Sequence, residues 1–271
     1  VTLTNTTGTI AFNGALTATT LSTATQAYNV ALNASTGTIT NAVTFANTGT
    51  VTLGASGGTL AFTGGVVATA PSGVNLAGTI TTNSAAVSLG ASSKTLTLVS
   101  DSTINTYADS GAGAAITIGG PVQGTSAGSQ SLTLISKGGA VTISDVVGSV
   151  VKLGTLTLGN ADQTGTITVN GTIAFNIALN NIVNAAGTTT ITNAASFYNT
   201  GTIRFGDYYS DVFNFLGGVT ANASSGVTVK ASEINSTASA QSLNAPLTFE
   251  TSATLSPGTG RITLGATTVN P

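Results

Sequence analysis

The stretch Ile39-Thr-Asn-Ala-Val-Thr-Phe-Ala-Asn-Thr-Gly-Thr-Val-Thr-Leu-Gly54 returns later in the chain as Ile191-Thr-Asn-Ala-Ala-Ser-Phe-Tyr-Asn-Thr-Gly-Thr-Ile-Arg-Phe-Gly206. Ten of the sixteen positions are identical. Two of the six exchanges keep apolar bulk at odd-numbered positions, where Val51 becomes Ile203 and Leu53 becomes Phe205, whereas exchanges such as Ala46 to Tyr198 and Thr52 to Arg204 fall on the positions between them. A period of two is the pattern of a half-buried β-strand. We therefore expect strands whose odd-numbered residues face a core.

The similarity between the two halves of the chain extends beyond this stretch. The segment from about residue 8 to about residue 76 resembles the segment from about residue 171 to about residue 229, with small insertions between the matching parts. Short strands that recur with such insertions indicate a repeat architecture, in which each unit buries its apolar face against the next. We expect residues 1–271 to form one continuous domain.

Apolar-polar-apolar triplets recur along the whole chain. They are Val51/Leu53, Leu60/Phe62, Val74/Leu76, Val87/Leu89, Leu96/Leu98, Ile116/Ile118, Leu132/Leu134, Val141/Ile143, Leu156/Leu158, Ile167/Val169, Ile203/Phe205, Val227/Val229, Leu247/Phe249 and Ile262/Leu264. Neighbouring triplets usually lie too close together for crossover helices, because such a connection alone needs a dozen or more residues. The Asn-Gly pairs typical of tight hairpins occur only at Asn13-Gly14 and Asn170-Gly171.

These spacings predict an all-β fold, a single-stranded parallel β-helix (β-solenoid) of about 11–13 coils with roughly 20 to 27 residues per coil. A series of β-sandwiches is the structural alternative, because its strands have a similar spacing. Many strands begin with Gly-Thr, as at Gly8, Gly49 and Gly78. We expect these glycines to occupy recurring corners that need a positive φ.

Asn41 and Asn193 share the inward parity of their apolar neighbours. Such an amide either stacks on the next coil at a corner or is an exposed turn residue, and the sequence leaves both alternatives open.

The composition excludes several classes of function. The chain has six basic and eight acidic residues, scattered singly, and no His or Cys. It therefore has no basic stripe that could bind nucleic acid. It also lacks histidine, the commonest general base, and so has neither a His nor a Cys ligand for zinc. No run of apolar residues is long enough to span a membrane as a helix. Because Val1 is not an initiator methionine, we interpret the sequence as mature or excerpted. We predict no enzymatic activity, cofactor or metal.

One charged and aromatic cluster stands out, between residues 204 and 211. Its members Arg204, Asp207, Tyr208, Tyr209 and Asp211 offer aromatic rings for sugar faces and carboxylates for calcium. The alternative is a solvated loop, since the other copy of the repeat has Gly-Ala-Ser-Gly-Gly at this point and loops vary where strands persist. We favour the loop and keep the cluster as a candidate ligand patch.

Thr-x-Thr triplets such as Thr79/Thr81 and Thr95/Thr97 raise the hypothesis of an ice-binding solenoid face. Their irregular spacing favours the simpler interpretation, that threonine is a preferred outward residue of strands.

The Gly-Thr-Ile starts, the repeated Ile-Thr-Asn-Ala phrase, and the phrases at residues 131–143 and 241–249 resemble giant bacterial surface exoproteins. These are the filamentous-haemagglutinin-like and autotransporter-like adhesins. The resemblance, which covers essentially the whole chain in texture, implies a right-handed parallel β-helix and a secreted, cell-surface, structural or adhesive role. A carbohydrate-binding or polysaccharide-degrading β-helix protein is the alternative function.

The two ends of the expected stack carry no strong capping residues. Neither Val1-Thr-Leu-Thr4 nor Ile262-Thr-Leu-Gly-Ala-Thr-Thr-Val-Asn270 contains a charged residue or a helix signal. Solenoids commonly protect their terminal strand edges with charged residues or a helix. We expect the stack to continue, through more chain or through head-to-tail association into a filament. Surface glycans are further expected partners.

Overall fold

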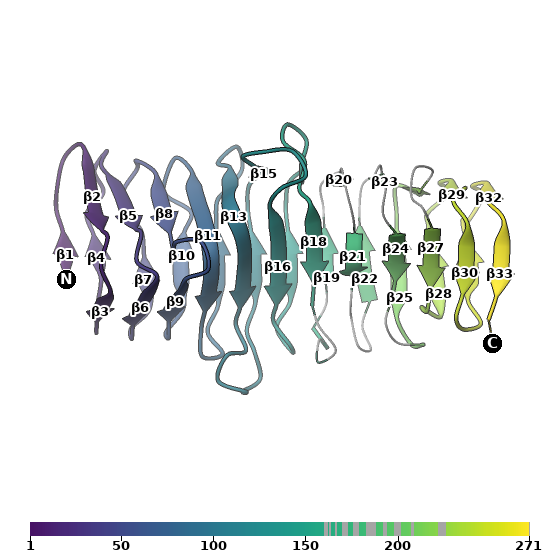
Figure 1. Cartoon of the computed structure of the whole chain (residues 1–271), viewed down its shortest axis with the longest axis horizontal. Coiled ribbons are helices and arrows are strands. Elements are labelled where there is room, and N and C mark those ends of the chain that lie inside the picture. Colours follow the sequence, from purple (N-terminus) through teal and green to yellow (C-terminus); the bar gives the residue numbers. More distant parts are fainter. Residues whose placement is uncertain are drawn as a thin grey trace.

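The computed structural model describes residues 1–270 except 160–161, 163, 166, 170–172, 176–178, 183–187, 192–193, 198–201, 207–208 and 222–225. In the described residues, short parallel strands stack into a β-solenoid of about 10 turns (Figure 1). Most turns contribute a strand to each of three faces, which we name A, B and C. This confirms the all-β solenoid that the strand spacing predicts.

Face A holds β2 (Thr9–Phe12), β5 (Asn29–Leu32), β8 (Val51–Leu53), the first halves of β11 (Val74–Thr81) and β13 (Leu96–Asn105), β15 (Val122–Gly124), β20 (Ile173–Phe175), β23 (Ala195–Phe197), β26 (Val219–Thr220), β29 (Gln241–Leu243) and β32 (Ile262–Leu264). Face B holds β3 (Leu16–Ala18), β6 (Thr36–Ile39), β9 (Thr59–Phe62), the second halves of β11 and β13, β16 (Ser131–Ile135), β18 (Thr155–Leu158), β21 (Leu179–Ile182), β24 (Thr202–Phe205), β27 (Gly226–Val229), β30 (Leu247–Phe249) and β33 (Thr267–Val269).

Face C holds β1 (Thr2–Leu3), β4 (Ser22–Thr23), β7 (Val43–Thr44), β10 (Val66–Ala68), β12 (Val87–Leu89), β14 (Ile116–Ile118), β17 (Val141–Ile143), β19 (Ile167–Val169), β22 (Thr188–Ile191), β25 (Val212–Phe215), β28 (Glu233–Asn235) and β31 (Thr254–Ser256). The strands from β7 to β31 form one continuous sheet. All fourteen apolar triplets lie in strands.

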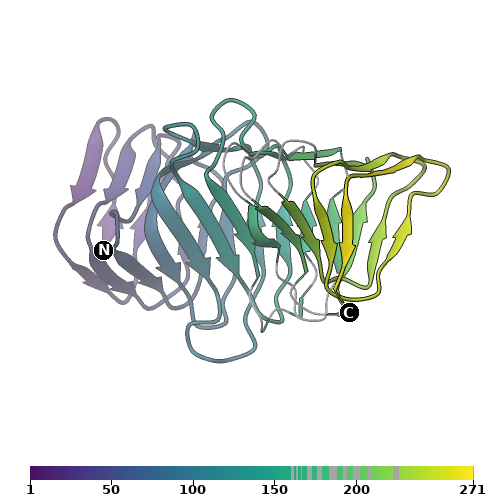
Figure 2. The same cartoon turned by 45° about the vertical axis from the view of Figure 1, so that its right-hand side comes forward.

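The pairing of described strands is parallel throughout, for example Val87 with Ile116 and Ile116 with Val141. The sandwich alternative is therefore wrong, because it requires antiparallel partners. The turns differ in length, as the short step from Thr2 to its partner Ser22 and the longer step from Thr103 to Thr133 illustrate. The extra residues lie in corners, seen in Figure 2 as loops above and below the faces, so the strands keep their alignment.

The core is a column of inward Val, Ile, Leu and Phe residues that runs through the stack. Interior strands alternate buried and half-buried residues, as the odd-even pattern predicts. Phe205, Phe213 and Phe215 are fully buried, with ring centroids 5.3 to 6.0 Å apart. Burying each ring contributes roughly 1.5 to 3 kcal/mol before entropy is subtracted.

The two copies of the repeated stretch lie on different faces. Residues 39–54 run from face B through C to A, in β6, β7 and β8, whereas residues 191–206 run from C through A to B, in β22, β23 and β24. The local backbone at their ends is nevertheless the same, since Gly54 and Gly206 have φ values of 87° and 79°. The repeating unit is thus a strand with its corner, one third of a turn.

The expected positive φ at strand starts is wrong for most of the Gly-Thr sites that the structure describes. Gly8 and Gly78 have it, but Gly49 does not. A Cβ at Gly49 would instead collide with the Tyr28 carbonyl oxygen of the previous turn and lie 2.6 Å from Asn29 Oδ1. Close packing between turns selects glycine at this position, and positive φ is needed at strand ends such as Gly54.

Candidate functional site

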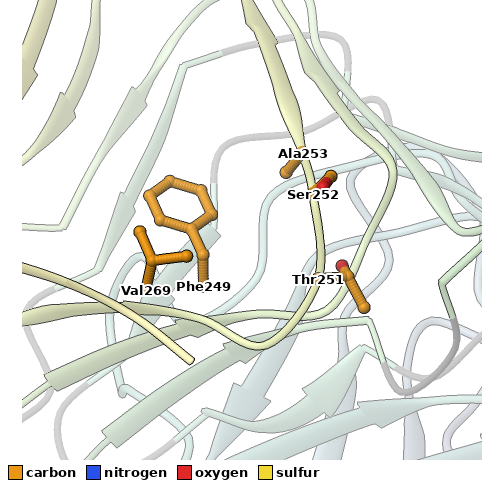
Figure 3. Close-up of a pocket in the computed structure, with 5 residues that line it drawn as sticks. All are labelled: Phe249, Thr251, Ser252, Ala253 and Val269. Carbon is orange, nitrogen blue, oxygen red and sulfur yellow. The ribbon is translucent and has the colours of Figure 1, made fainter. Parts of the chain in front are cut away.

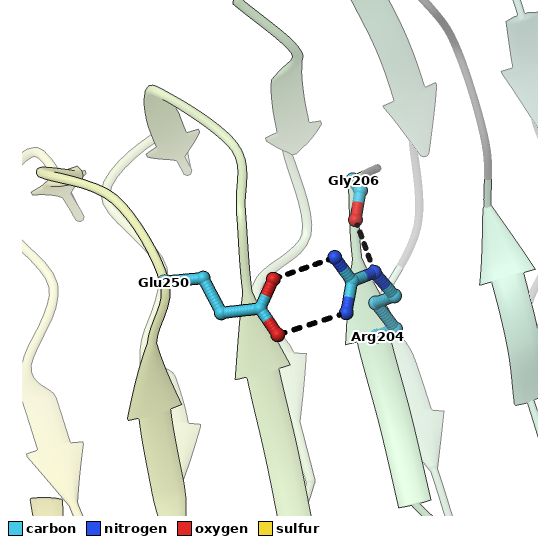
Figure 4. Close-up of polar contacts among 3 residues, drawn as sticks. All are labelled: Arg204, Gly206 and Glu250. Carbon is cyan, nitrogen blue, oxygen red and sulfur yellow. Dashed lines mark hydrogen bonds and ion pairs between the residues drawn. The ribbon is translucent and has the colours of Figure 1, made fainter. Parts of the chain in front are cut away.

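Arg204 forms a bidentate ion pair with Glu250, which lies two turns further along the stack. Its Nη1 donates to Glu250 Oε1 at 3.1 Å, its Nη2 donates to Oε2 at 2.7 Å, and its Nε donates to the Gly206 carbonyl at 3.0 Å (Figure 4). Arg204 in β24 is aligned with Thr228 in β27, which is aligned with Thr248 in β30. The guanidinium therefore reaches over the intervening turn to the residue that follows β30.

This contact changes the acidity of Glu250. The hydrogen bonds from Arg204 lower the pKa of the Glu250 carboxyl below its ordinary 4.5, against a smaller opposing effect of burial, and the charges of Arg204 and Lys230 act in the same direction as the hydrogen bonds. Both side chains of the pair remain about one third exposed, at 29% and 35%. The pair is a salt bridge on the outer surface, and the Arg204 guanidinium is already bound to Glu250.

Of the other predicted patch residues, the structure describes Tyr209 and Asp211, and these two differ in exposure. Tyr209 is 60% exposed, whereas Asp211 is fully buried. A Cβ at Gly206 would lie 2.9 Å from Asp211 Oδ2, so this carboxylate fills the corner. Asp207 and Tyr208 lie outside the described residues. The ligand patch stays a prediction, and Tyr209 is its one described exposed ring.

A shallow depression of about 300 Å³ lies beside Glu250, on the last turn. Phe249, Thr251, Ser252, Ala253 and Val269 line it (Figure 3). Val269 is 67% exposed, and Thr251 Oγ1 is buried without a hydrogen-bond partner in the described part of the chain. A mostly apolar depression of this kind can accept a side chain.

Sequence reasoning missed one arrangement, a row of threonines along face B. Thr36, Thr59, Thr79, Thr103, Thr133 and Thr157 occupy the same register in six consecutive turns. We call this set the threonine row. Because its intervals are unequal, with Thr59 and Thr79 closer in the chain than Thr103 and Thr133, the sequence gives no fixed period. The alignment of these threonines is visible only in the folded chain, because corners of unequal length separate them in the sequence.

Amide side chains link neighbouring turns. Asn41 is exposed and donates to Thr20 Oγ1 of the previous turn at 2.9 Å, so it is both a turn residue and a link between turns. Asn193 lies outside the described residues. The buried amide is Asn47, which donates to the carbonyls of Tyr28 and Thr50 at 3.0 and 3.4 Å. The inward parity of Asn47 was the signal that could have found it.

Within the described part of the chain, no three acidic side chains converge as a metal ion requires. A helix able to span a membrane is likewise not found among these residues. No protein-family model, curated protein or solved structure matches the chain.

Proposed function

We propose that this chain is a structural segment of an extracellular or cell-surface bacterial fibre or giant adhesin, whose solenoid stacks end to end with further turns. The observation that supports it is the pattern of exposure on the last turn. Ile262 and Leu264 are 38% and 41% exposed, while Gln241 and Leu243, their partners one turn earlier, are fully buried. One more turn would cover the same inward positions.

The two end turns are chemically matched. At the N-terminal end the inward residues are Leu3 on face C, Ile10 and Phe12 on face A, and Leu16 on face B. Leu3 is buried, whereas the inward residues of faces A and B are half-buried. At the other end, face B presents Val269 beside the depression (Figure 3). Apolar residues thus meet apolar residues on faces A and B if a turn is added in parallel register. The resemblance of the sequence to surface exoproteins supports the extracellular assignment.

The test is electron microscopy of the purified 271-residue chain. A single stack of about 10 turns at about 4.8 Å per turn is a rod about 50 Å long. We expect rods of several such lengths joined end to end, and single rods for the double variant Leu264→Lys/Val269→Lys. Val150→Lys is the control, because Val150 is 83% exposed on a lateral loop. Single short rods for the unmodified chain would contradict the proposal.

Glycan binding is the second candidate, and the exposure of the Tyr209 ring favours it, since aromatic rings pack on sugar faces. Tyr209→Ala should then abolish retention on a glycan array. An unmodified chain that retains no glycan on such an array would remove this candidate.

A further inference from the structure

The threonine row lies on the outer surface of face B. The strands that carry it, β6, β9, β11, β13, β16 and β18, run side by side across the front of the rod (Figure 1). Thr36 and Thr59 are exposed, and the four that follow are half-buried. The residues between the outward ones point inward and are buried, as the pattern of β16 illustrates, except for the half-buried Gly37 of β6.

The hydroxyl groups of the first five members of this row are not used by the part of the fold that the structure describes. Those of Thr36, Thr59, Thr79, Thr103 and Thr133 make no hydrogen bond to the described part of the chain. Face A differs, because Thr52 Oγ1 accepts from Asn75 Nδ2 at 3.3 Å and Thr9 Oγ1 from Asn29 Nδ2 at 3.2 Å. Each of these five hydroxyls can both donate and accept, so the row from Thr36 to Thr133 is open to molecules outside the solenoid.

The row is regular, rigid and uncharged. Stacked parallel strands repeat at about 4.8 Å, and the β-branched threonine side chain has few accessible χ1 rotamers. A second row lies two residues further along the same strands, at Thr38, Ala61, Thr81, Asn105 and Ile135. Neither row contains a charged residue or an aromatic ring. The surface is therefore a two-dimensional array made mostly of hydroxyl and methyl groups.

This chemistry fits an ordered water lattice better than a sugar chain or a protein. Sugar sites normally supply aromatic rings for stacking, and protein interfaces are enriched in aromatic residues and arginine, which these rows lack. A repeat of about 4.8 Å is comparable with the distance between equivalent water molecules along the short edge of the ice cell. Hydroxyls that bond to water at that repeat, with methyl groups between them, can hold a layer of water already arranged as in ice.

We infer that face B, through the threonine row, binds ice. This activity is independent of end-to-end stacking, because the row lies along the side of the rod. It would hold the solenoid, and whatever the solenoid is attached to, against the surface of an ice crystal.

The test is thermal hysteresis of the purified 271-residue chain, with ice-crystal shape observed during cooling. We expect a gap between the melting and freezing temperatures, and loss of that gap in Thr103→Lys/Thr133→Lys, which places two charges in the middle of the row. The control is Ser92→Lys, an exposed corner residue on the route from face C to face A, which should keep the full gap.

Circular dichroism melting establishes that each protein is folded. A folded unmodified chain without any gap, or a double variant that keeps it, would overturn the inference. So would side-by-side dimers in sedimentation that the double variant dissociates, because face B would then be an interface between two copies.

Discussion

At the scale of single residues, the stacked backbone dictates which side chains are tolerated. Gly49 and Gly14 are both glycines near strands, yet their surroundings differ. A Cβ at Gly49 would collide with the backbone of the previous turn, whereas a Cβ at Gly14 would meet nothing within 4 Å.

Gly49→Ala should therefore destabilise the fold by about 1 to 3 kcal/mol, as overpacking does, and Gly14→Ala should change stability by less than about 0.5 kcal/mol. Thermal melting followed by circular dichroism measures both. Equal melting temperatures for the two variants would show that the turns can separate at no cost.

The Arg204–Glu250 ion pair predicts a small pH dependence. The pKa of Glu250 is lowered in the fold, so its contribution is present above the ordinary pKa of 4.5 and is lost as the pH falls through the lower folded value. For a pair this exposed the contribution is below about 1 kcal/mol.

When the pH is lowered from about 6 to about 3, the melting temperature of the unmodified chain should therefore fall slightly more than that of Glu250→Gln. Glu233→Gln, which removes an exposed carboxylate without a salt bridge in the described residues, is the control for the loss of one negative charge. An identical pH profile for Glu250→Gln would show that the pair adds nothing.

At the scale of elements, strands keep their register while corners vary in length. The short turn that joins Thr2 to Ser22 and the long one that joins Thr103 to Thr133 both stack in parallel register, because an insertion between strands costs only loop-closure entropy. An insertion inside a strand has the opposite effect, since it moves every later side chain of that strand to the other face.

Two glycines inserted between Ala127 and Gly128, in a corner, should lower stability by less than about 1 kcal/mol. One glycine inserted after Ser88 in β12 should lower the melting temperature much more, because it turns Leu89 outward. Thermal melting of both proteins makes the comparison. Equal losses would mean that strand register does not carry the stability.

The same distinction explains what the sequence could predict. The alternation around Val51 and Leu53 was enough to identify strands and inward residues, because burial follows a period of two within each strand. The threonine row could not be found in this way, since corners of unequal length hide which threonines become neighbours. The partner of Arg204 was equally hidden, because Glu250 lies 46 residues away.

At the scale of the whole molecule, the strands run across the rod and the hydrogen bonds between turns run along it. Oriented preparations of the chain should therefore give a diffraction reflection at about 4.8 Å along the long axis. A reflection of that spacing perpendicular to the axis would contradict the stacked arrangement.

The displacement of the two repeat copies by one face has a consequence for how such a protein can lengthen. Since a strand and its corner fit equally well on any side, a duplicated segment need not be a whole number of turns. A duplication of any other length rotates the copy about the axis, so an epitope carried twice in the gene points in two directions. Growth by thirds of a turn would thus distribute one surface motif around the circumference of a fibre.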